Sequence, residues 1–284
     1  MKSKQWKWFH SVVVVLLSIA LALLAIYIHN YTSLCAWWMI MGIVAGAILI
    51  IGHGVTGVWR GAFIDERNVI SLSRFQLLAW TVLILSAFMT AAFWNVGLST
   101  IPQPLDEIKL DPTLWMLMGI STASLVASPL LLSSKKAQTP NVAEMQQTFE
   151  LLKQQGDDQV SNQGLVVTNT DIGNARWSDM FTGEETGNAA RMDLSRLQMF
   201  FFTLVALLTY GVTLGGMFRD PVFIGAGFGP FPMLSEGLLA LIGISHTGYL
   251  AAKGLSNSQT GDTGVPAGAP VATPDSDNDQ PAMG

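Results

Sequence analysis

Six long apolar segments, nearly free of charged residues, constrain this chain more than any other feature of its sequence. Charged residues make up 12% of its 284 residues, whereas soluble domains carry about 25%. A helix needs about 20 mostly apolar residues to cross the hydrocarbon layer of a membrane. We therefore predict an all-α, polytopic membrane protein with six transmembrane helices, at residues 9–28, 34–51, 75–94, 114–132, 197–217 and 233–252.

Basic residues flank these segments at every second boundary, which predicts how the chain is oriented. Lysine and arginine concentrate in the cytoplasmic loops of membrane proteins. They lie before the first segment, between the second and third, after the fourth and after the sixth: Lys2, Lys4, Lys7, Arg60, Arg67, Arg74, Lys135, Lys136 and Lys253. We expect a multi-pass protein of the plasma membrane or a bacterial inner membrane, with both termini in the cytoplasm.

The first apolar segment, residues 9–28, follows a basic start, as the core of a secretory signal peptide does. It is longer than such a core, and it ends at Tyr27-Ile28-His29-Asn30 rather than in small residues. We expect this segment to be retained as a membrane helix, with a cleaved signal peptide as the alternative.

A five-residue motif opens both the third and the fifth apolar segments. Leu72-Ser73-Arg74-Phe75-Gln76 recurs 122 residues later as Leu194-Ser195-Arg196-Leu197-Gln198. The next apolar segment of each pair contains a second motif, at Gly119-Ile120-Ser121 and Gly243-Ile244-Ser245. Both pairs start inside, cross outward and return. They predict a helical hairpin that is duplicated in parallel, with its symmetry axis along the membrane normal.

The segments before the two hairpins also share an order of residues, with Phe63, Glu66 and Asn68 in the first and Phe181, Glu184 and Asn188 in the second. The chain then divides into an N-terminal hairpin (1–56), a first repeat (57–136), a polar cytoplasmic insert (137–175), a second repeat (176–253) and a tail (254–284). Apolar residues at helical spacing predict one short amphipathic helix at 141–155, whereas residues 156–187 show no strong periodicity. The tail, rich in Gly, Pro, Ser and Asp, is expected to be disordered.

The repeated Leu-Ser-Arg-x-Gln motif permits two interpretations. Its serine is placed to cap a helix, and its arginine lies at the level of the lipid phosphates. Arginines at helix ends usually extend to those phosphates, which is a purely anchoring role. The functional alternative is a cytoplasmic mouth that binds an anion or the carboxylates of a partner. The residues of this mouth are Arg74, Gln76, Arg196 and Gln198.

Small residues within the apolar segments indicate close contacts between helices. Glycine and serine let helix backbones approach, and a serine hydroxyl can hydrogen-bond across the interface. We expect such contacts within the chain or between the copies of a homo-oligomer. The candidate packing residues are Gly42, Gly46, Gly119, Ser121, Gly243 and Ser245.

The last apolar segment contains two ionisable residues, Glu236 and His246. Glu236 lies near the outer end, within reach of water. His246 lies deeper, where a polar side chain is costly and by default indicates a pathway or a pairing. A neutral, hydrogen-bonded packing histidine is the simpler interpretation, and a proton relay is the alternative. Ser245 and His246 point about 100° apart on a helix, so they do not form a nucleophile–base pair.

No pattern in the sequence predicts catalysis. The single cysteine, Cys35, excludes an intramolecular disulfide, and no phosphate-binding, zinc-binding or paired-carboxylate motif is present. The formal net charge of −5 implies no nucleic-acid partner, and we expect no cofactor or metal.

Most of the polar sequence lies on the predicted cytoplasmic side. This favours a non-enzymatic, oligomeric platform or membrane anchor for a cytoplasmic protein partner. An ion channel or small-solute permease is the alternative, supported by the polar residues of the mouth and by His246. Against this alternative, the apolar segments carry few polar residues that could line a hydrated path.

Overall fold

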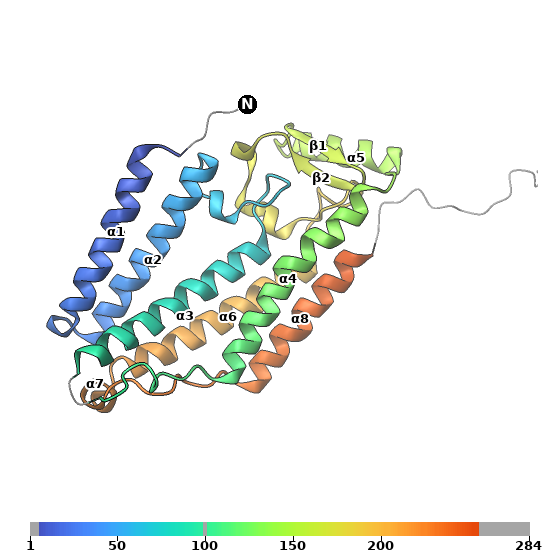
Figure 1. Ribbon diagram of the computed structural model, residues 1–284. Coiled ribbons are helices and arrows are strands. Elements are labelled where there is room, and N and C mark those ends of the chain that lie inside the picture. The colour runs from blue at the N-terminus through green and yellow to red at the C-terminus, as the bar shows by residue number, and fades with distance from the viewer. Residues whose placement is uncertain (1–5, 99–100, 256–284) are drawn as a thin grey trace, which may run out of the picture.

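The computed structural model describes residues 6–98 and 101–255, which form a bundle of long helices with a smaller cap at one end (Figure 1). Within these residues, five helices are long and apolar enough to cross a membrane: α1 (Trp8–Ile26), α2 (Ser33–Thr56), α3 (Leu72–Gly97), α4 (Pro112–Lys136) and α6 (Leu194–Met217). A sixth helix, α8 (Glu236–Gly254), is not in this set. Its 19 residues include Glu236, His246 and Lys253, which lower its hydropathy. The chain is therefore a mostly helical protein with five helices that could span a membrane.

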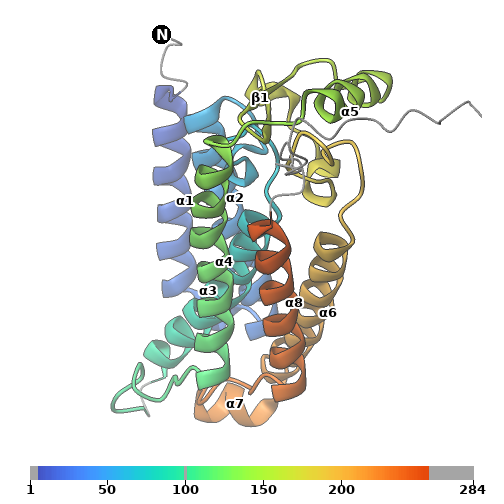
Figure 2. The same ribbon diagram turned by 90° about the vertical axis from the view of Figure 1, so that its right-hand side faces the viewer.

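The long helices alternate in direction. α1, α3 and α6 run away from the cap, and α2, α4 and α8 return toward it (Figures 1 and 2). We call the end that holds α5 (Val142–Gln154) the cap end. The opposite end holds the short helix α7 (Pro221–Ala226), and we call it the α7 end. The predicted disorder of the tail concerns mainly residues 256–284, which lie outside the described residues.

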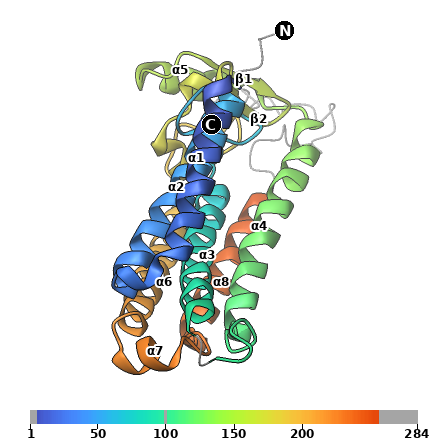
Figure 3. The ribbon, with the colours of Figure 1, turned by 60° about the vertical axis from the view of Figure 1, so that its left-hand side comes forward.

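Four of the long helices form a ring. α3 packs against α4 and α6, and α8 packs against the same two helices. The hairpin of α1 and α2 lies outside this ring, with α2 against α3 (Figure 3). A two-fold axis along the bundle would place α3 across the ring from α6 and α4 across from α8. Instead these like helices are neighbours, so the predicted symmetry axis is wrong and the two hairpins lie side by side.

Trp37 joins the outer hairpin to the ring. Its side chain is 2% exposed, and its indole N–H donates to Ser86 Oγ of α3 at 3.0 Å. Its ring also packs on Phe218, with 5.2 Å between the ring centroids. The neighbouring Trp38 is 58% exposed. Of these two adjacent indoles, Trp37 is therefore part of the core and Trp38 faces outward.

The cap consists of residues 57–71 and 137–193, folded against each other. The predicted amphipathic helix is present as α5, and it ends before Gly156, whose φ of 79° suits glycine. An antiparallel hairpin follows, formed by β1 (Val160–Gln163) and β2 (Val166–Asn169). The segment without strong periodicity is therefore folded, because strands of four residues are too short to show a pattern.

Hydrogen bonds from one backbone amide and three side chains to backbone carbonyls join the two parts of the cap. Asn169 N–H donates to Arg67 O at 2.9 Å, and the amides of Asn68 and Asn169 each donate to the other residue's carbonyl at 2.9 Å. Arg60 also donates to Gly173 O at 2.6 Å. The cap is thus one structure built from segments about a hundred residues apart.

The predicted packing glycines make few close contacts with other helices in the structure. A Cβ added at Gly42, Gly46 or Gly119 would meet nothing within 4 Å, so none of the other described helices packs closely there. At Gly243 the nearest atom is the side chain of Ile120, at 3.8 Å. The prediction of close packing within the chain is wrong for the first three glycines, and contact between copies stays a prediction.

The serines of the Gly-Ile-Ser motifs do not form the predicted hydrogen bond between α4 and α8. Ser121 and Ser245 are buried, but neither hydroxyl has a hydrogen-bond partner among the described residues. Instead, Ser124 Oγ and His246 Nδ1 are joined by a hydrogen bond of 2.6 Å. This interhelical bond therefore lies one turn beyond the Gly-Ile-Ser motif of α4, and a second, from Lys253 Nζ to Ser128 Oγ, lies about one turn further.

Replacing Trp37 by alanine is expected to lower the free energy of unfolding by about 3–5 kcal/mol, because it removes a buried aromatic side chain. Trp38→Ala is the matched control and should change stability little, since its indole is largely exposed. Thermal unfolding of both variants in a mild detergent measures the difference. Equal destabilisation by the two variants would contradict the placement of Trp37.

Candidate functional site

A buried carboxylate at the cap end forms ion pairs with three positively charged side chains. Glu184 lies in the cap, between β2 and α6, and is 6% exposed. Its Oε1 lies 2.5 Å from Lys253 Nζ of α8 and 3.3 Å from a guanidinium nitrogen of Arg67, and it also contacts Arg196 of α6. We call these four residues the Glu184 cluster. It joins both parts of the cap to the ends of two long helices.

The charges of the cluster depend on one another. Burial by itself would raise the pKa of Glu184, but the positive charges of Arg196, Arg67 and Lys253 hold it well below its ordinary value. Burial likewise opposes the charge of Arg67, while Asp65 and Glu184 raise its pKa above the ordinary value. Desolvating these ions is costly, so each remains charged only because the others are present.

Hydrogen bonds complete the surroundings of Lys253. Its Nζ donates to Ser128 Oγ of α4 at 2.6 Å and to the hydroxyl of Tyr249 at 3.0 Å. The guanidinium carbon of Arg196 lies 5.5 Å from the centroid of the Tyr249 ring, a cation–π contact. α4, α6 and α8 are therefore tied to the same buried ions.

A second buried ion pair fastens the end of α4 to the cap. Lys135 Nζ lies 2.5 Å from Glu185 Oε1, and both side chains are buried. The backbone carbonyl of Lys135 also accepts a hydrogen bond from Leu165 N–H at 3.1 Å. Val167 N–H donates to Glu184 O at 2.9 Å, so the loop that carries both glutamates is also bonded to β2.

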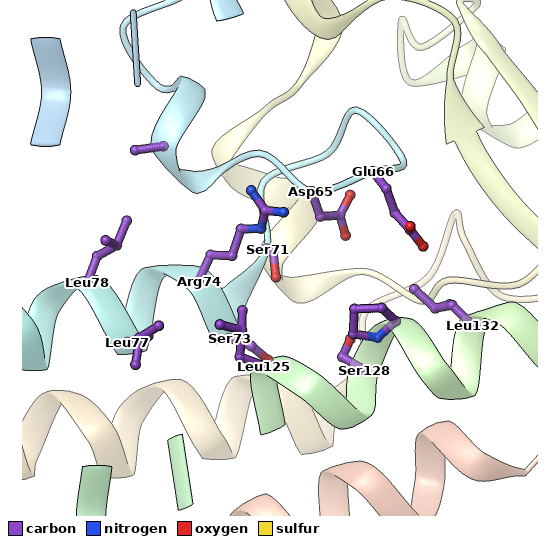
Figure 4. Close-up of a pocket in the computed structure, with 12 residues that line it drawn as sticks. Asp65, Glu66, Ser71, Ser73, Arg74, Leu77, Leu78, Leu125, Ser128 and Leu132 are labelled. Atoms are coloured by element: carbon purple, nitrogen blue, oxygen red, sulfur yellow. The ribbon is translucent and has the colours of Figure 1, made fainter. Parts of the chain in front are cut away.

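Two pockets open at the cap end. One, of about 390 Å³, lies over the Glu184 cluster beside the start of α6, and we call it the α6 pocket. The other, of about 330 Å³, lies between the start of α3 and the last turns of α4, and we call it the α3 pocket (Figure 4). The α3 pocket has a polar side and an apolar side. Its polar side includes Asp65, Glu66, Ser71, Ser73 and Arg74, and its apolar side includes Leu77, Leu78, Leu125 and Leu132.

The helical residues of the two pockets occupy corresponding positions in the sequence. Ser73 and Arg74 line the α3 pocket, and Ser195 and Arg196, each 122 residues later, line the α6 pocket. On the returning helices, the corresponding residues are 124 positions apart. They are Leu125, Ser128 and Pro129 in α4, and Tyr249, Ala252 and Lys253 in α8.

The loops over the two pockets are closed by the same hydrogen bonds. Ser71 N–H donates to Phe63 O at 2.9 Å, and Asp193 N–H donates to Phe181 O at 2.8 Å. Two residues closer to the tip of each loop, Asp65 N–H donates to Val69 O at 2.9 Å and Gly183 N–H donates to Arg191 O at 3.1 Å. The tip of the second loop is four residues longer. Each loop therefore presents a glutamate, Glu66 or Glu184, to its own pocket.

The four residues of the predicted mouth do not form one ring. Arg74 lines the α3 pocket and donates to Ile64 O at 2.6 Å, whereas Arg196 is buried in the Glu184 cluster. Gln76 is buried between α3 and α6 and donates to Thr203 Oγ1 at 2.6 Å, whereas Gln198 is exposed. The two copies of the motif thus differ in environment, and a symmetric mouth is excluded.

The serines of the motif were also expected to cap the helices, and this is wrong. Ser73 and Ser195 lie inside the first turns of α3 and α6. The capping positions are held by Ser71 and Asp193, and the Asp193 carboxylate accepts from Ser195 N–H at 2.9 Å.

The two ionisable residues predicted in the last segment lie apart. Glu236 is exposed in the first turn of α8, at the α7 end. His246 is buried and bonded to Ser124, as a packing histidine would be. The structure does not bring them together as one polar site.

Sequence reasoning missed the ions that hold the cap. Lys253 and Lys135 were used only as indicators of orientation, and Glu184 only as part of a resemblance between loops. That resemblance was the signal that could have found the cluster, because it matched Glu184 to Glu66. In the part of the chain that the structure describes, no three His, Cys, Asp or Glu side chains are grouped as metal ligands would be.

Comparison of the chain with protein-family models, with curated proteins and with solved structures yielded no match. The geometry of the cap end therefore carries the functional argument.

Glu184→Gln is expected to lower the free energy of unfolding by about 3–5 kcal/mol at neutral pH, because it leaves buried cations without their counter-charge. The contribution of the wild-type carboxylate is fully present above the ordinary glutamate pKa of 4.5 and is lost as the pH falls through the lowered pKa of the folded state. Below pH 4.5 the variant should therefore lose less stability than the wild type. Thermal unfolding in detergent over this pH range measures both effects.

Glu66→Gln is the matched control for this variant, since Glu66 is 46% exposed and pairs with Lys136 at 3.0 Å. Its substitution should cost less than about 1 kcal/mol. A loss as large as that of Glu184→Gln would contradict the special role of the buried carboxylate.

Proposed function

We propose that this protein is a non-enzymatic membrane platform whose cap docks a soluble protein partner on the cytoplasmic face of a plasma membrane or bacterial inner membrane. The observation that supports this most is the joining of the cap to the bundle by the Glu184 cluster. A partner that binds such a cap is held at a fixed position on the membrane. A cap that served only as a connecting loop would not need four buried ions.

The surface of α5 supports a protein partner rather than lipid. Its inner side packs through Phe149 and Leu152 onto the β-hairpin. Its outer side is polar, with Glu144, Gln147 and Glu150 exposed. Helices that lie on membranes carry lysine and arginine on this side, whereas α5 has a single lysine.

The topology that we propose has six spans, with α8 as the sixth. α8 packs into the ring against α4 and α6 and returns toward the cap, as α2 and α4 do. We also infer that the two hairpins with their preceding loops are copies of one unit. The corresponding residues of the two pockets and the matching hydrogen bonds of the two loops support this.

The outer face of α2 supports assembly into a homo-oligomer. Gly42 and Gly46 leave open space on this helix, and a glycine pair of this spacing lets another helix approach closely. Such an assembly would present several caps on one side of the membrane and increase the avidity for a multivalent partner.

The platform proposal predicts that Gln147→Lys/Glu150→Lys on α5 lowers partner capture at least about tenfold, because it reverses the charge of the docking surface. Gln103→Lys/Glu107→Lys makes the same chemical changes at exposed positions of the α7 end and should capture as wild type does. The measurement is a pull-down from native membranes in mild detergent, with bound proteins quantified by mass spectrometry. Equal capture by the two variants, or no soluble partner with the wild type, would contradict the proposal.

An ion channel or small-solute permease is the second candidate. Within the described residues, several buried polar atoms of the ring have no hydrogen-bond partner, among them Gln76 Oε1, Trp80 Nε1 and the hydroxyls of Ser121 and Ser245. Buried polar groups normally bond to protein or to water, so these atoms favour a hydrated path along the ring.

The channel hypothesis predicts that Gln76→Leu alters ion or solute flux into liposomes, because it removes a buried polar group from the ring. Gln198→Leu changes the corresponding but exposed residue and should leave flux unchanged. Wild-type protein that gives no flux above empty liposomes would exclude this candidate.

A further inference from the structure

The α6 pocket contains two charged groups that the chain itself supplies. At the start of α6, the Asp193 carboxylate accepts from Ser195 N–H at 2.9 Å and from Arg196 N–H at 3.3 Å. On its other side, the ammonium of Lys253 lies 2.5 Å from Glu184. The Asp193 carboxylate thus lies at the N-terminus of α6 and the Lys253 ammonium lies on Glu184. Both groups come from the chain itself, and we call them the internal groups of this pocket.

The α3 pocket lacks counterparts of the Asp193 carboxylate and of Lys253, because the sequence differs at the two corresponding positions. Its Glu66 is paired instead with Lys136, which is not part of the lining, at 3.0 Å. Ser71 stands where the other pocket has Asp193, and it makes no side-chain hydrogen bond to the first turn of α3. Pro129 stands where the other pocket has Lys253. The α3 pocket therefore has no side-chain anion at the start of its helix and no lysine at the position of Lys253.

The groups that would receive this ligand are present. Ser73 lines the pocket, is 2% exposed, and its hydroxyl has no hydrogen-bond partner among the described residues. Arg74 is the next residue, and one of its guanidinium N–H groups donates to Ile64 O. Glu66 corresponds to Glu184, and Asp65 adds a second carboxylate where the other loop has Gly183.

We propose that the α3 pocket binds the head group of a zwitterionic phospholipid with a primary ammonium. Its phosphate lies at the N-terminus of α3 and accepts from Ser73 and Arg74, since helix N-termini and guanidinium groups favour phosphate. Its ammonium lies at Glu66 and Asp65. These carboxylates already bond to Lys136 and Arg67, but a carboxylate has about four acceptor positions.

The chemistry of the lining selects this lipid among others. The lining residues carry one cation, Arg74, and two carboxylates, so an anionic head group is disfavoured. A primary ammonium has three N–H donors for the carboxylates, whereas a quaternary ammonium has none. Leu77 and Leu125 continue the pocket along α3 and α4, the helices that are apolar enough for the membrane, and they would contact the acyl chains.

This lipid site stands apart from partner docking on α5, so either proposal can fail without the other. The test is native mass spectrometry of the purified protein, loaded with phosphatidylethanolamine, phosphatidylcholine or phosphatidylglycerol of the same acyl chains. We expect one phosphatidylethanolamine per protein, bound about tenfold more tightly than the other two, as the loss of one charge-assisted hydrogen bond would give.

Ser71→Asp/Pro129→Lys installs the internal groups of the α6 pocket and should abolish this preference. Ser235→Asp/Pro102→Lys makes the same residue changes at exposed positions of the α7 end and should retain it. Ser73→Ala, a smaller change, should weaken phosphatidylethanolamine binding about tenfold. Unfolding temperatures equal to that of the wild type establish that the variants fold.

Three results would overturn the proposal. One is equal retention of the three lipids, which indicates annular contact only. Another is stronger retention of phosphatidylglycerol, which indicates a simple anion site. The third is displacement of the lipid by inorganic phosphate as effectively as by phosphoethanolamine, which would show that the ammonium contributes nothing.

Discussion

The carboxylate of Glu184 is the interaction on which the rest of the structure depends. It neutralises three cations that come from the cap, α6 and α8. The backbone carbonyl of Glu184 also accepts a hydrogen bond from Val167 N–H of β2. Buried ions of this kind do not add stability in proportion to their number, because desolvation offsets much of their attraction. They do specify one arrangement, since any other leaves a charge buried without its partner. The cap and the ring of helices therefore form one unit.

The two occurrences of the Leu-Ser-Arg-x-Gln motif lie in different environments at the same end of the ring, the cap end. Arg196 is enclosed with Glu184 and Lys253, whereas Arg74 lines an open pocket that holds Pro129 in place of a lysine. One copy is internally satisfied and stabilises the cap. The other lines a pocket with no side-chain anion at the helix start and with Pro129 at the position of Lys253, and this difference supports our proposal that the α3 pocket binds a phospholipid head group.

The sequence predicted the long helices well because membrane helices depend on length and apolarity, which are local properties. Both occurrences of the Leu-Ser-Arg-x-Gln motif lie at the cap end, and which side of a membrane this end faces stays a prediction. The sequence could not assign roles, because Arg74 and Arg196 have the same local sequence and differ only in partners from distant segments. Trp37 and Trp38 were indistinguishable for the same reason, since helix orientation decides which indole is buried. The β-hairpin was missed because its strands are short and are stabilised by contacts with residues 57–71 and 184–186.

Hydrogen–deuterium exchange of the protein in lipid nanodiscs tests most directly whether the cap and the bundle are one unit. We predict that the amides of Val167, Thr186 and Asp193, which donate to backbone carbonyls of the cap, exchange as slowly as those of the ring helices. With Glu184 replaced by glutamine, these amides should exchange faster together, while α1 and α2 keep their protection. Cap amides that exchange in the wild type as fast as those of an unfolded peptide would contradict the account.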